Sequence, residues 1–379
     1  MRKPKVVVVG AGPAGSACAL ALRKLDAAEV LLLDKSAYPR VKVCGSGLSP
    51  LALRMLDRLD IRDRFTANHG LIRALIVRGP GGGETTLRGK AQAWVVPRTE
   101  FDHAVAKASV SHGARFQEET KATELIRDAR GDVRGVRTTR GDVEADLVVC
   151  ADGSPSRFSR DESPKTTIRT LMGWWRGTTL PHDEAIMVWD RRLDGYYAWS
   201  FPEPCGVTNV GITIPEGAPD ATRLKELFTD ILAEHFDHGL RGAEQVGKWM
   251  GHPAVVTTRV GEVAESRAMW IGEAARLVMP ATAEGIGFAL QSGLLAGEMV
   301  AKHFRNETGF SRLACRRYRV ETATRMLPKF WAGEAFVRVM RSERARTLSD
   351  RLMHSRIKQL AERAVSNLVG GDVDGARVP

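Results

Sequence analysis

The chain opens with two short apolar runs separated by a helical stretch. A Val-rich run at residues 5–9 ends at Gly10, and an Ala- and Leu-rich segment follows from about 13 to 25. A second apolar run at 30–33 ends at Asp34. Runs of this length without alternation are typical of strands buried on both faces. The pattern therefore predicts a strand–helix–strand unit of parallel type.

The hydrophobic pattern then changes twice along the chain. From about 71 to 97 polar and apolar residues alternate around a glycine-rich turn at 79–83, which predicts antiparallel strands. Further strands are expected at 120–150, across most of 165–260, and at 269–271. Helices are expected at 50–59, 98–111, near 220–236, at 284–304 and through 311–369, where Pro328 breaks or kinks the helical pattern.

Composition narrows the class of protein. The chain has 379 residues, 43% hydrophobic and 27% charged, with no apolar run of the ~18–20 residues that a membrane span needs. The N-terminal residues do not resemble a signal peptide, so we expect a cytoplasmic protein. Five scattered cysteines without a CxxC pair, and histidines without an HExxH pattern, predict neither a disulfide framework nor a metal site.

The net charge of +11 is concentrated near the C-terminus. Residues 310–363 hold 14 Lys or Arg and 5 Asp or Glu, in a segment with helical periodicity. Two interpretations stay open: a solvated helical cap, or a basic amphipathic surface that contacts anionic lipid or an acidic partner. We expect no nucleic-acid binding, because no aromatic–basic motif accompanies the charge.

A dinucleotide-binding motif lies between the first strand and the first helix. In Gly10-Ala11-Gly12-Pro13-Ala14-Gly15 the first glycine permits a tight turn and the second lets a pyrophosphate approach the backbone. Gly15 allows close packing of helix on strand, and the helix N-terminus offers amide donors. Asp34 ends the second strand, where a carboxylate can accept hydrogen bonds from a ribose.

Motifs later in the chain distinguish FAD from NAD as the cofactor, through a resemblance to a known family. Cys150-Ala151-Asp152-Gly153 and Trp270-Ile271-Gly272-Glu273-Ala274-Ala275 each follow a predicted strand, and Glu284-Gly285-Ile286 precedes the predicted helix at 284–304. This set resembles the FAD-dependent enzymes built on the p-hydroxybenzoate hydroxylase plan. Glu273 stands where aspartate is commoner, and Cys150 and Ala283 replace frequent glycines.

A narrower resemblance is to the geranylgeranyl reductase family. Residues 39–50, Pro-Arg-Val-Lys-Val-Cys-Gly-Ser-Gly-Leu-Ser-Pro, match its PRxKxCGGGL loop with Ser46 in place of one glycine. Residues 197–202 match its YxWxFP strand, and residues 209–211 its NVG strand. The resemblance implies FAD contacts at Gly10, Gly12, Ala14, Gly15, Asp34, Cys44, Gly45, Gly47, Arg98, Ala122, Glu273, Gly285 and Ile286.

The substrate side of the expected site is aromatic. Tyr197, Trp199 and Phe201 alternate with other residues, so their rings share one strand face, which suits either a substrate wall or an ordinary sheet face. Adjacent Trp174 and Trp175 face opposite ways, so only one can join such a wall. Cys44 is the candidate catalytic residue, as a reactive thiol or proton donor, with a purely structural contact as the alternative.

The resemblance implies an α/β fold: a Rossmann-type FAD-binding domain, an inserted antiparallel β-sheet substrate domain and a C-terminal helical segment. The FAD-binding parts are expected at 1–70, 98–160 and 263–308, substrate-domain parts at 71–97 and 161–262, and the basic segment at 309–379.

The implied reaction is reduction of C=C bonds in an isoprenoid or similar apolar metabolite. The alternative is a monooxygenase, halogenase or oxidase/dehydrogenase on the same scaffold. No second dinucleotide motif is present for NAD(P)H, so that donor would dock transiently or a protein would supply electrons.

Overall fold

The structure, a computed structural model, describes residues 2–88, 92–159 and 165–343. Its nucleotide-binding half is built on a six-stranded sheet within that part of the chain, in the order β19-β20-β12-β1-β2-β8. Every neighbouring pair is parallel except β19 with β20. The strands are β1 (Lys5–Val9), β2 (Glu29–Leu33), β8 (Arg115–Gln117), β12 (Leu147–Cys150), β19 (Ala264–Glu265) and β20 (Ala268–Trp270).

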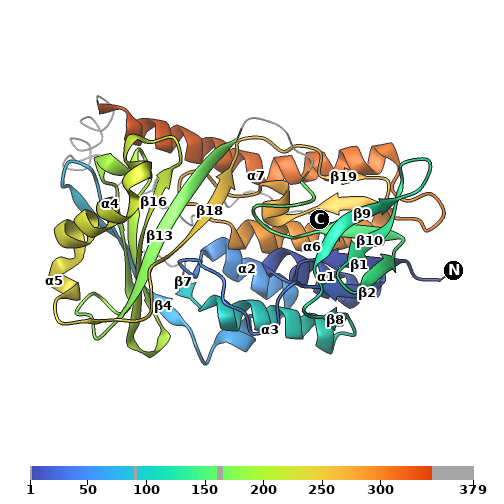
Figure 1. Cartoon of the computed structure of the whole chain (residues 1–379), viewed down its shortest axis with the longest axis horizontal. Helices are drawn as coiled ribbons and strands as arrows, with labels where there is room; N and C mark the ends of the chain where they lie inside the picture. Colours follow the sequence, from blue (N-terminus) through green and yellow to red (C-terminus); the bar gives the residue numbers. More distant parts are fainter. Residues whose placement is uncertain (1, 89–91, 160–164, 344–379) are drawn as a thin grey trace.

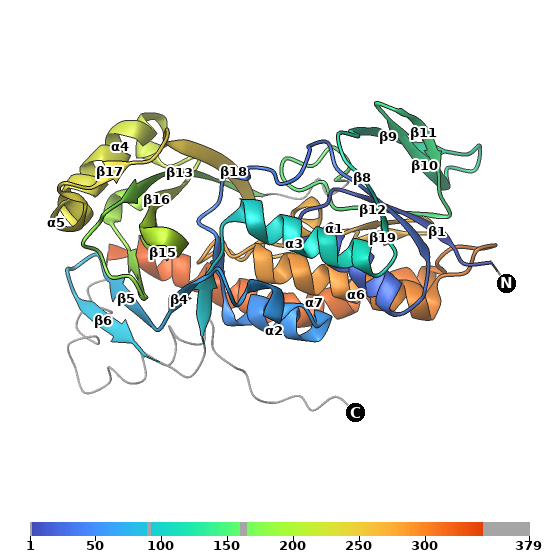
Figure 2. The same ribbon diagram turned by 90° about the horizontal axis from the view of Figure 1, so that it is seen from below.

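Helices cover one face of this sheet and a small sheet covers the other (Figures 1 and 2). The helices are α1 (Pro13–Lys24), α2 (Pro50–Leu59), α3 (Arg98–Ser111) and α6 (Ile286–His303). Helix α6 packs closely on α1, since a Cβ at Gly293 would lie 2.3 Å from the carbonyl oxygen of Ala14. The opposite layer is the antiparallel sheet β9 (Ala122–Arg127), β10 (Val133–Thr138) and β11 (Gly141–Glu144).

The second half is a larger, mainly antiparallel sheet in the order β17-β13-β16-β15-β14-β5-β6, with β18 also paired to β13. Its strands are β5 (Ala74–Arg78), β6 (Glu84–Leu87), β13 (Thr166–Arg176), β14 (Glu184–Val188), β15 (Ala198–Glu203), β16 (Val207–Pro215), β17 (Glu244–Gln245) and β18 (Met250–Val256). A small sheet of β3 (Gly47–Leu48), β7 (Ala93–Val95) and β4 (Gly70–Ile72) adjoins it. The expected combination of a parallel nucleotide-binding sheet and an inserted antiparallel sheet is confirmed.

The segment expected as one helix near 220–236 is divided into short pieces. A 3₁₀ turn at Pro219–Arg223 leads into α4 (Leu224–Ile231), a π-helical turn at Leu232–Phe236 and α5 (Asp237–Leu240). A π turn brings residues five apart onto one face. Ile231 and Phe236 are both fully buried in the same apolar cluster against the sheet, which accounts for the irregularity.

The long helix α7 (Arg312–Arg341) joins the two halves (Figure 1). It continues through Pro328, so of the two expected effects of this proline a break is wrong, while a kink stays a prediction. Phe330 packs edge-on against Phe288 of α6, with ring centroids 4.9 Å apart, and Arg341 pairs with Asp194 at 3.2 Å. The rest of the predicted basic segment, from 344 on, lies outside the described residues. None of the described helices combines the length and apolar character needed to cross a membrane.

Candidate functional site

A cavity of about 990 Å³ lies between the two halves of the molecule. It is lined by the carboxyl ends of β1, β2 and β12, the loop before β3, the N-terminus of α6 and one face of the large sheet. All of the predicted site residues line it except Gly15. A cavity at the carboxyl ends of parallel strands is where an α/β sheet binds its ligand.

Two glycines of the motif after β1, Gly10 and Gly15, leave no room for side chains. Gly10 has a φ of +100°, and a Cβ there would lie 2.3 Å from the carbonyl oxygen of Ala151. Gly15 faces away from the cavity, and a Cβ there would lie 1.9 Å from the carbonyl oxygen of Gly10. Its role is therefore the close packing of α1 on β1. Gly12 caps α1 without a side-chain hydrogen bond, so the first amides of the helix are left for a ligand.

Asp34 is fixed at the end of β2 by backbone amides. Its carboxylate accepts hydrogen bonds at 2.9 Å from the amides of Ala11 and Ser36, and the Tyr38 hydroxyl lies 3.3 Å away. The side chain is 7% exposed. Because the amides orient both oxygens, the carboxylate is held in a fixed position at the cavity wall.

Arg98 belongs to a buried cluster of charged side chains with Asp102 and Arg40. Of these three, only Arg98 was predicted as a site residue. Its guanidinium donates to both oxygens of Asp102, at 2.7 and 2.8 Å, and Arg40 lies 2.9 Å from the same carboxylate. Burial alone would lower the pKa of Arg98, but Asp102 and Cys44 raise it above its ordinary value. Asp102 lies four residues after Arg98 on α3, a spacing that places both on one helix face.

Arg40 lies in the loop before β3, residues 39–46, called here the nucleotide loop, and it extends over the glycine-rich turn after β1. Its Nη2 atom lies 3.4 Å from where a Cβ at Gly12 would be, and its Nε donates a hydrogen bond to the Tyr38 hydroxyl at 2.9 Å. A cation beside the free amides of α1 suits a pyrophosphate. The signal was present in the Pro39-Arg40 motif, although Arg40 was not among the predicted site residues.

Two departures from the family pattern have a backbone consequence. Ser46 and Ala283, which replace glycines, adopt φ values of +61° and +51°. These are left-handed conformations that glycine adopts without a Cβ penalty. Ser46 is 4% exposed, and the loop around it passes over the aromatic residues of β15: a Cβ at Gly45 would lie 3.1 Å from Trp199 Nε1 and 3.3 Å from Phe201.

The three aromatic rings at and just before β15 form one wall of the cavity. Ring centroids lie 6.0 Å apart for Tyr197 and Trp199, and 6.1 Å apart for Trp199 and Phe201. The Trp199 indole donates to Asn209 Oδ1 at 2.7 Å. A Cβ at Gly211 would lie 2.3 Å from the Trp199 ring, so the Asn209-Val-Gly211 motif of β16 both holds and accommodates this ring.

Trp174 and Trp175 face opposite sides of the large sheet, as expected. Trp175 packs into the cluster under α4, whereas Trp174 packs on the side of Trp199 and Phe201. The Trp174 indole donates to Glu203 Oε1 at 3.1 Å. Burial raises the pKa of Glu203 to about 7, with the hydrogen bond from Trp174 opposing the shift.

The N-terminus of α6 supplies the remaining predicted residues. Gly285 caps the helix, and a Cβ there would lie 3.8 Å from Glu273 Oε1. Glu284 was not predicted as a site residue; it is hydrogen-bonded to the Ser49 hydroxyl and lines the cavity. Burial raises the pKa of Glu284, while the bond from Ser49 opposes the shift. Helix amides and the carboxylates of Glu273 and Glu284 thus meet at this end.

Cys44 lies where the nucleotide loop meets the aromatic wall. The amide of Ser46 donates to its Sγ at 3.4 Å, and the guanidinium of Arg98 interacts with the same side chain. The thiol is partly exposed and lines the cavity. It is free, so it can take part in proton transfer.

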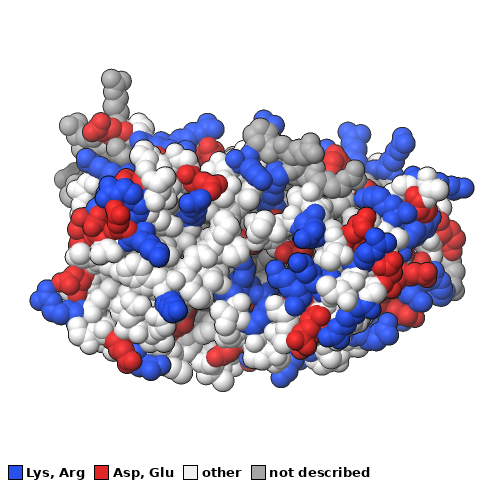
Figure 3. Space-filling model, in the orientation of Figure 1, with Lys and Arg blue, Asp and Glu red and all other residues white. Residues whose placement is uncertain are grey.

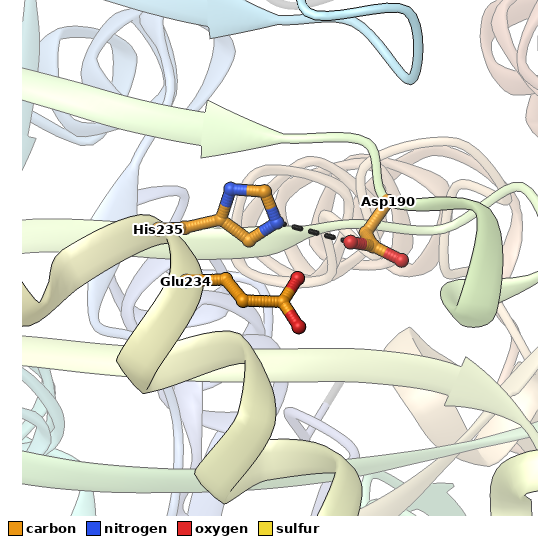
Figure 4. A group of neighbouring side chains, drawn as sticks. All are labelled: Asp190, Glu234 and His235. Atoms are coloured by element: carbon orange, nitrogen blue, oxygen red, sulfur yellow. Dashed lines mark hydrogen bonds and ion pairs between the residues drawn. The ribbon is translucent and has the colours of Figure 1, made fainter.

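One group of metal-type ligands lies away from this cavity, within the part of the chain that the structure describes (Figure 4). His235 Nε2 lies 3.0 Å from Asp190, with Glu234 alongside. Arg192 bonds both carboxylates, at 2.8 Å to Asp190 and 2.6 Å to Glu234. Burial would raise the pKa of Asp190, but hydrogen bonds from Arg192 and His235 hold it well below its ordinary value. The guanidinium already supplies the positive charge, and we assign no metal here.

Comparison with known proteins gives concordant results. The family model of the FAD binding domain matches residues 3–326. The chain is 31% identical to menaquinone reductase of Mycolicibacterium smegmatis over 318 residues, 78% of this chain and 76% of that protein. It is 27% identical to digeranylgeranylglycerophospholipid reductase of Methanothrix thermoacetophila over 373 residues, 92% of this chain and 90% of that protein.

Solved structures with the same fold include two kinds of flavoprotein. A geranylgeranyl bacteriochlorophyll reductase-like protein from Thermoplasma acidophilum superimposes with a TM-score of 0.84 at 23% identity, covering 97% of this chain and 96% of that one. A flavin-dependent brominase, Bmp2, gives a TM-score of 0.80 at 19% identity, covering 98% and 95%. At these identities the likeness concerns the fold.

Proposed function

Because the chain belongs to the FAD-binding-domain family, within its geranylgeranyl reductase group, we propose that it reduces C=C bonds of an isoprenoid or similarly apolar metabolite. The protein is an FAD-dependent oxidoreductase. The observation that carries the substrate class is the position of the aromatic wall. Tyr197, Trp199 and Phe201 lie in the same cavity as the glycine-rich turn, and Trp199 and Phe201 lie directly against the nucleotide loop at Gly45.

The cavity residues suit FAD along its length. Asp34 would bind the adenosine ribose, the amides of α1 the pyrophosphate with Arg40 beside them, and Glu273 the ribityl chain. The amides at Gly285 and Ile286 would lie at the ring, and Ala14, Gly47 and Ala122 would line the cofactor. Bound FAD supplies the hydride chemistry, and the protein contributes orientation and electrostatics.

The chain's own residues would align the substrate and supply a proton. The rings of β15 present a flat apolar surface, extended by Met172, Met187 and Leu75 of the large sheet. Such a surface orients an alkene by burial of apolar area and excludes water from it. Cys44 is the proposed proton donor, because its Sγ lies at the junction of the nucleotide loop and this wall.

We also propose that α7 contacts a membrane surface, from which an apolar substrate would enter. Leu313, Val320 and Trp331 are 72%, 54% and 57% exposed, and their spacings of 7 and 11 residues place them on one face of α7. Figure 3 shows mainly Lys and Arg along the edge where α7 runs. Co-sedimentation with anionic but not neutral liposomes is expected. Binding that ignores lipid charge and is unchanged in W331A would contradict it.

The electron donor is proposed to act transiently, either as NAD(P)H or as a reduced protein. In this proposal FAD occupies the dinucleotide-binding motif between β1 and α1. Anaerobic mixing of the oxidised holoenzyme with NADH or NADPH should bleach the flavin if a nicotinamide is the donor. Bleaching only by a low-potential reduced protein would assign the role to a protein donor.

The reaction is tested by anaerobic reduction with dithionite followed by addition of unsaturated lipids. A polyprenyl substrate should restore the absorbance of oxidised flavin without oxygen. If no unsaturated lipid does so, the proposed reduction is wrong. Product formation that requires oxygen and releases peroxide would instead favour a monooxygenase or halogenase, the alternative consistent with the brominase fold.

A further inference from the structure

Two basic side chains meet inside the cavity, and neither was among the predicted site residues. Lys42 Nζ lies 2.7 Å from His252 Nε2, and both residues line the cavity. Lys42 belongs to the nucleotide loop, two residues before Cys44, whereas His252 lies on β18 opposite Thr170 of β13. The contact therefore joins the nucleotide loop to strand β18 of the large sheet.

The partner of Lys42 carries no charge near neutral pH. Burial, with the nearby Lys42, lowers the pKa of His252 to about 4. A neutral imidazole can accept the hydrogen bond that Lys42 donates. Burial also lowers the pKa of Lys42, while the carboxylate of Glu273 opposes that shift and favours the ammonium form.

Lys42 differs from Arg40 and Arg98, the two buried guanidinium groups of the cavity, in having no carboxylate partner in the described part of the chain. Within the described residues no carboxylate lies within ion-pair distance of Lys42, whereas Arg98 and Arg40 share Asp102. Lys35, the further cation that influences His252, is exposed to solvent. A charge in a partly enclosed site is screened less than one at the surface, so Lys42 places an unmatched positive charge on the cavity wall.

We propose that Lys42, oriented by His252, stabilises the reduced form of the bound FAD and so sets its reduction potential. The inference rests on the proposed function. Two electrons and one proton convert oxidised flavin to its anionic reduced form, which carries one more negative charge. Lys42 lines the same cavity as Glu273 and Cys44, both proposed flavin contacts, and both act electrostatically on its ammonium group. A cation near the flavin favours the more negative form.

The experiment is a measurement of the midpoint potential of the holoenzyme against redox dyes, without substrate. K42M should shift the equilibrium at least tenfold toward oxidised flavin, which for a two-electron couple is about 30 mV more negative. K42R keeps the charge and should stay within about threefold of the wild type. K35M, which removes an exposed cation from the same cavity, is the matched control and should also stay close to it.

Two substitutions at His252 distinguish the effect of the charge of Lys42 from the effect of its hydrogen bond to residue 252. H252Q keeps a neutral acceptor for Lys42 and should leave the potential near that of the wild type. H252E places a carboxylate against Lys42, cancels its charge and should lower the potential as K42M does. This pair also decides the question if K42M fails to retain flavin.

Equal potentials in wild-type and K42M enzymes that both hold a full complement of flavin would overturn the proposal. Equal potentials in H252E and H252Q would do the same. Because no substrate is present, these outcomes are independent of whether an unsaturated lipid reoxidises the enzyme. The proposed reaction can therefore fail while the role of Lys42 stands, and the reverse also holds.

Discussion

Substituting Gly211 with alanine tests whether β16 sets the position of the aromatic wall. A Cβ at Gly211 would lie 2.3 Å from Cζ2 of Trp199 and 2.8 Å from Cβ of Met172. Both distances are shorter than any real contact, and Gly211 lies between β15 and β13, so the backbone cannot easily retreat. The Trp199 ring must then shift, and space beside it is limited at the loop around Gly45, where even a Cβ would lie 3.1 Å from Trp199 Nε1.

The expected cost is that of overpacking a buried site, about 1–3 kcal/mol in the free energy of unfolding. Urea unfolding followed by circular dichroism measures it. Gly217 is the matched control, because a Cβ there meets nothing within 4 Å and G217A should be nearly neutral. We also expect G211A to retain FAD but to lose most of its reoxidation by lipid, since Trp199 belongs to the substrate wall.

A second mutation shows whether the clash with Trp199 is the cause. Phenylalanine lacks the outer ring atoms that approach Gly211, so the penalty of G211A should be smaller in a W199F background than in the wild type. The difference is a coupling energy between the two positions. Equal penalties in both backgrounds, or a G211A enzyme as stable and active as G217A, would refute the reasoning.

Two further predictions concern the cofactor turn and a buried acid. G10A places a Cβ 2.3 Å from the carbonyl oxygen of Ala151 at a φ of +100°, and the purified protein should contain little or no flavin by absorbance; a full complement would contradict the reading of this turn. Glu203, with a folded-state pKa of about 7, resists ionisation when buried, so the wild type should lose on the order of 2 kcal/mol of stability as the pH rises from about 4.5 through 7. E203Q still accepts from Trp174 and should show a flatter pH dependence in thermal unfolding; parallel curves for the two proteins would exclude Glu203 as the cause.

Local patterns were enough to predict much of the fold. The helices expected at 50–59 and 98–111 have those bounds in the structure, and the first strand–helix–strand unit is present. The period of two in Tyr197, Trp199 and Phe201 predicted a shared face, which the ring spacings confirm. These features depend on neighbours in the sequence, and therefore on backbone geometry that the sequence specifies locally.

The features that sequence reasoning missed depend on residues brought together from distant positions. Lys42 and His252 are 210 residues apart, and nothing in either local pattern predicts their contact. The sharing of Asp102 by Arg40 and Arg98 likewise depends on how the nucleotide loop packs against α3. Charge pairing across the fold follows from tertiary packing, which periodicity and spacing do not encode.

The most direct test of the account is product analysis after a single anaerobic turnover. Dithionite-reduced holoenzyme is mixed with an unsaturated isoprenoid lipid in excess, and the lipid is analysed by mass spectrometry. We expect up to one equivalent of a product heavier by two hydrogens per flavin, formed together with the return of oxidised flavin absorbance. Lipid of unchanged mass and flavin that remains reduced until oxygen is admitted would contradict it.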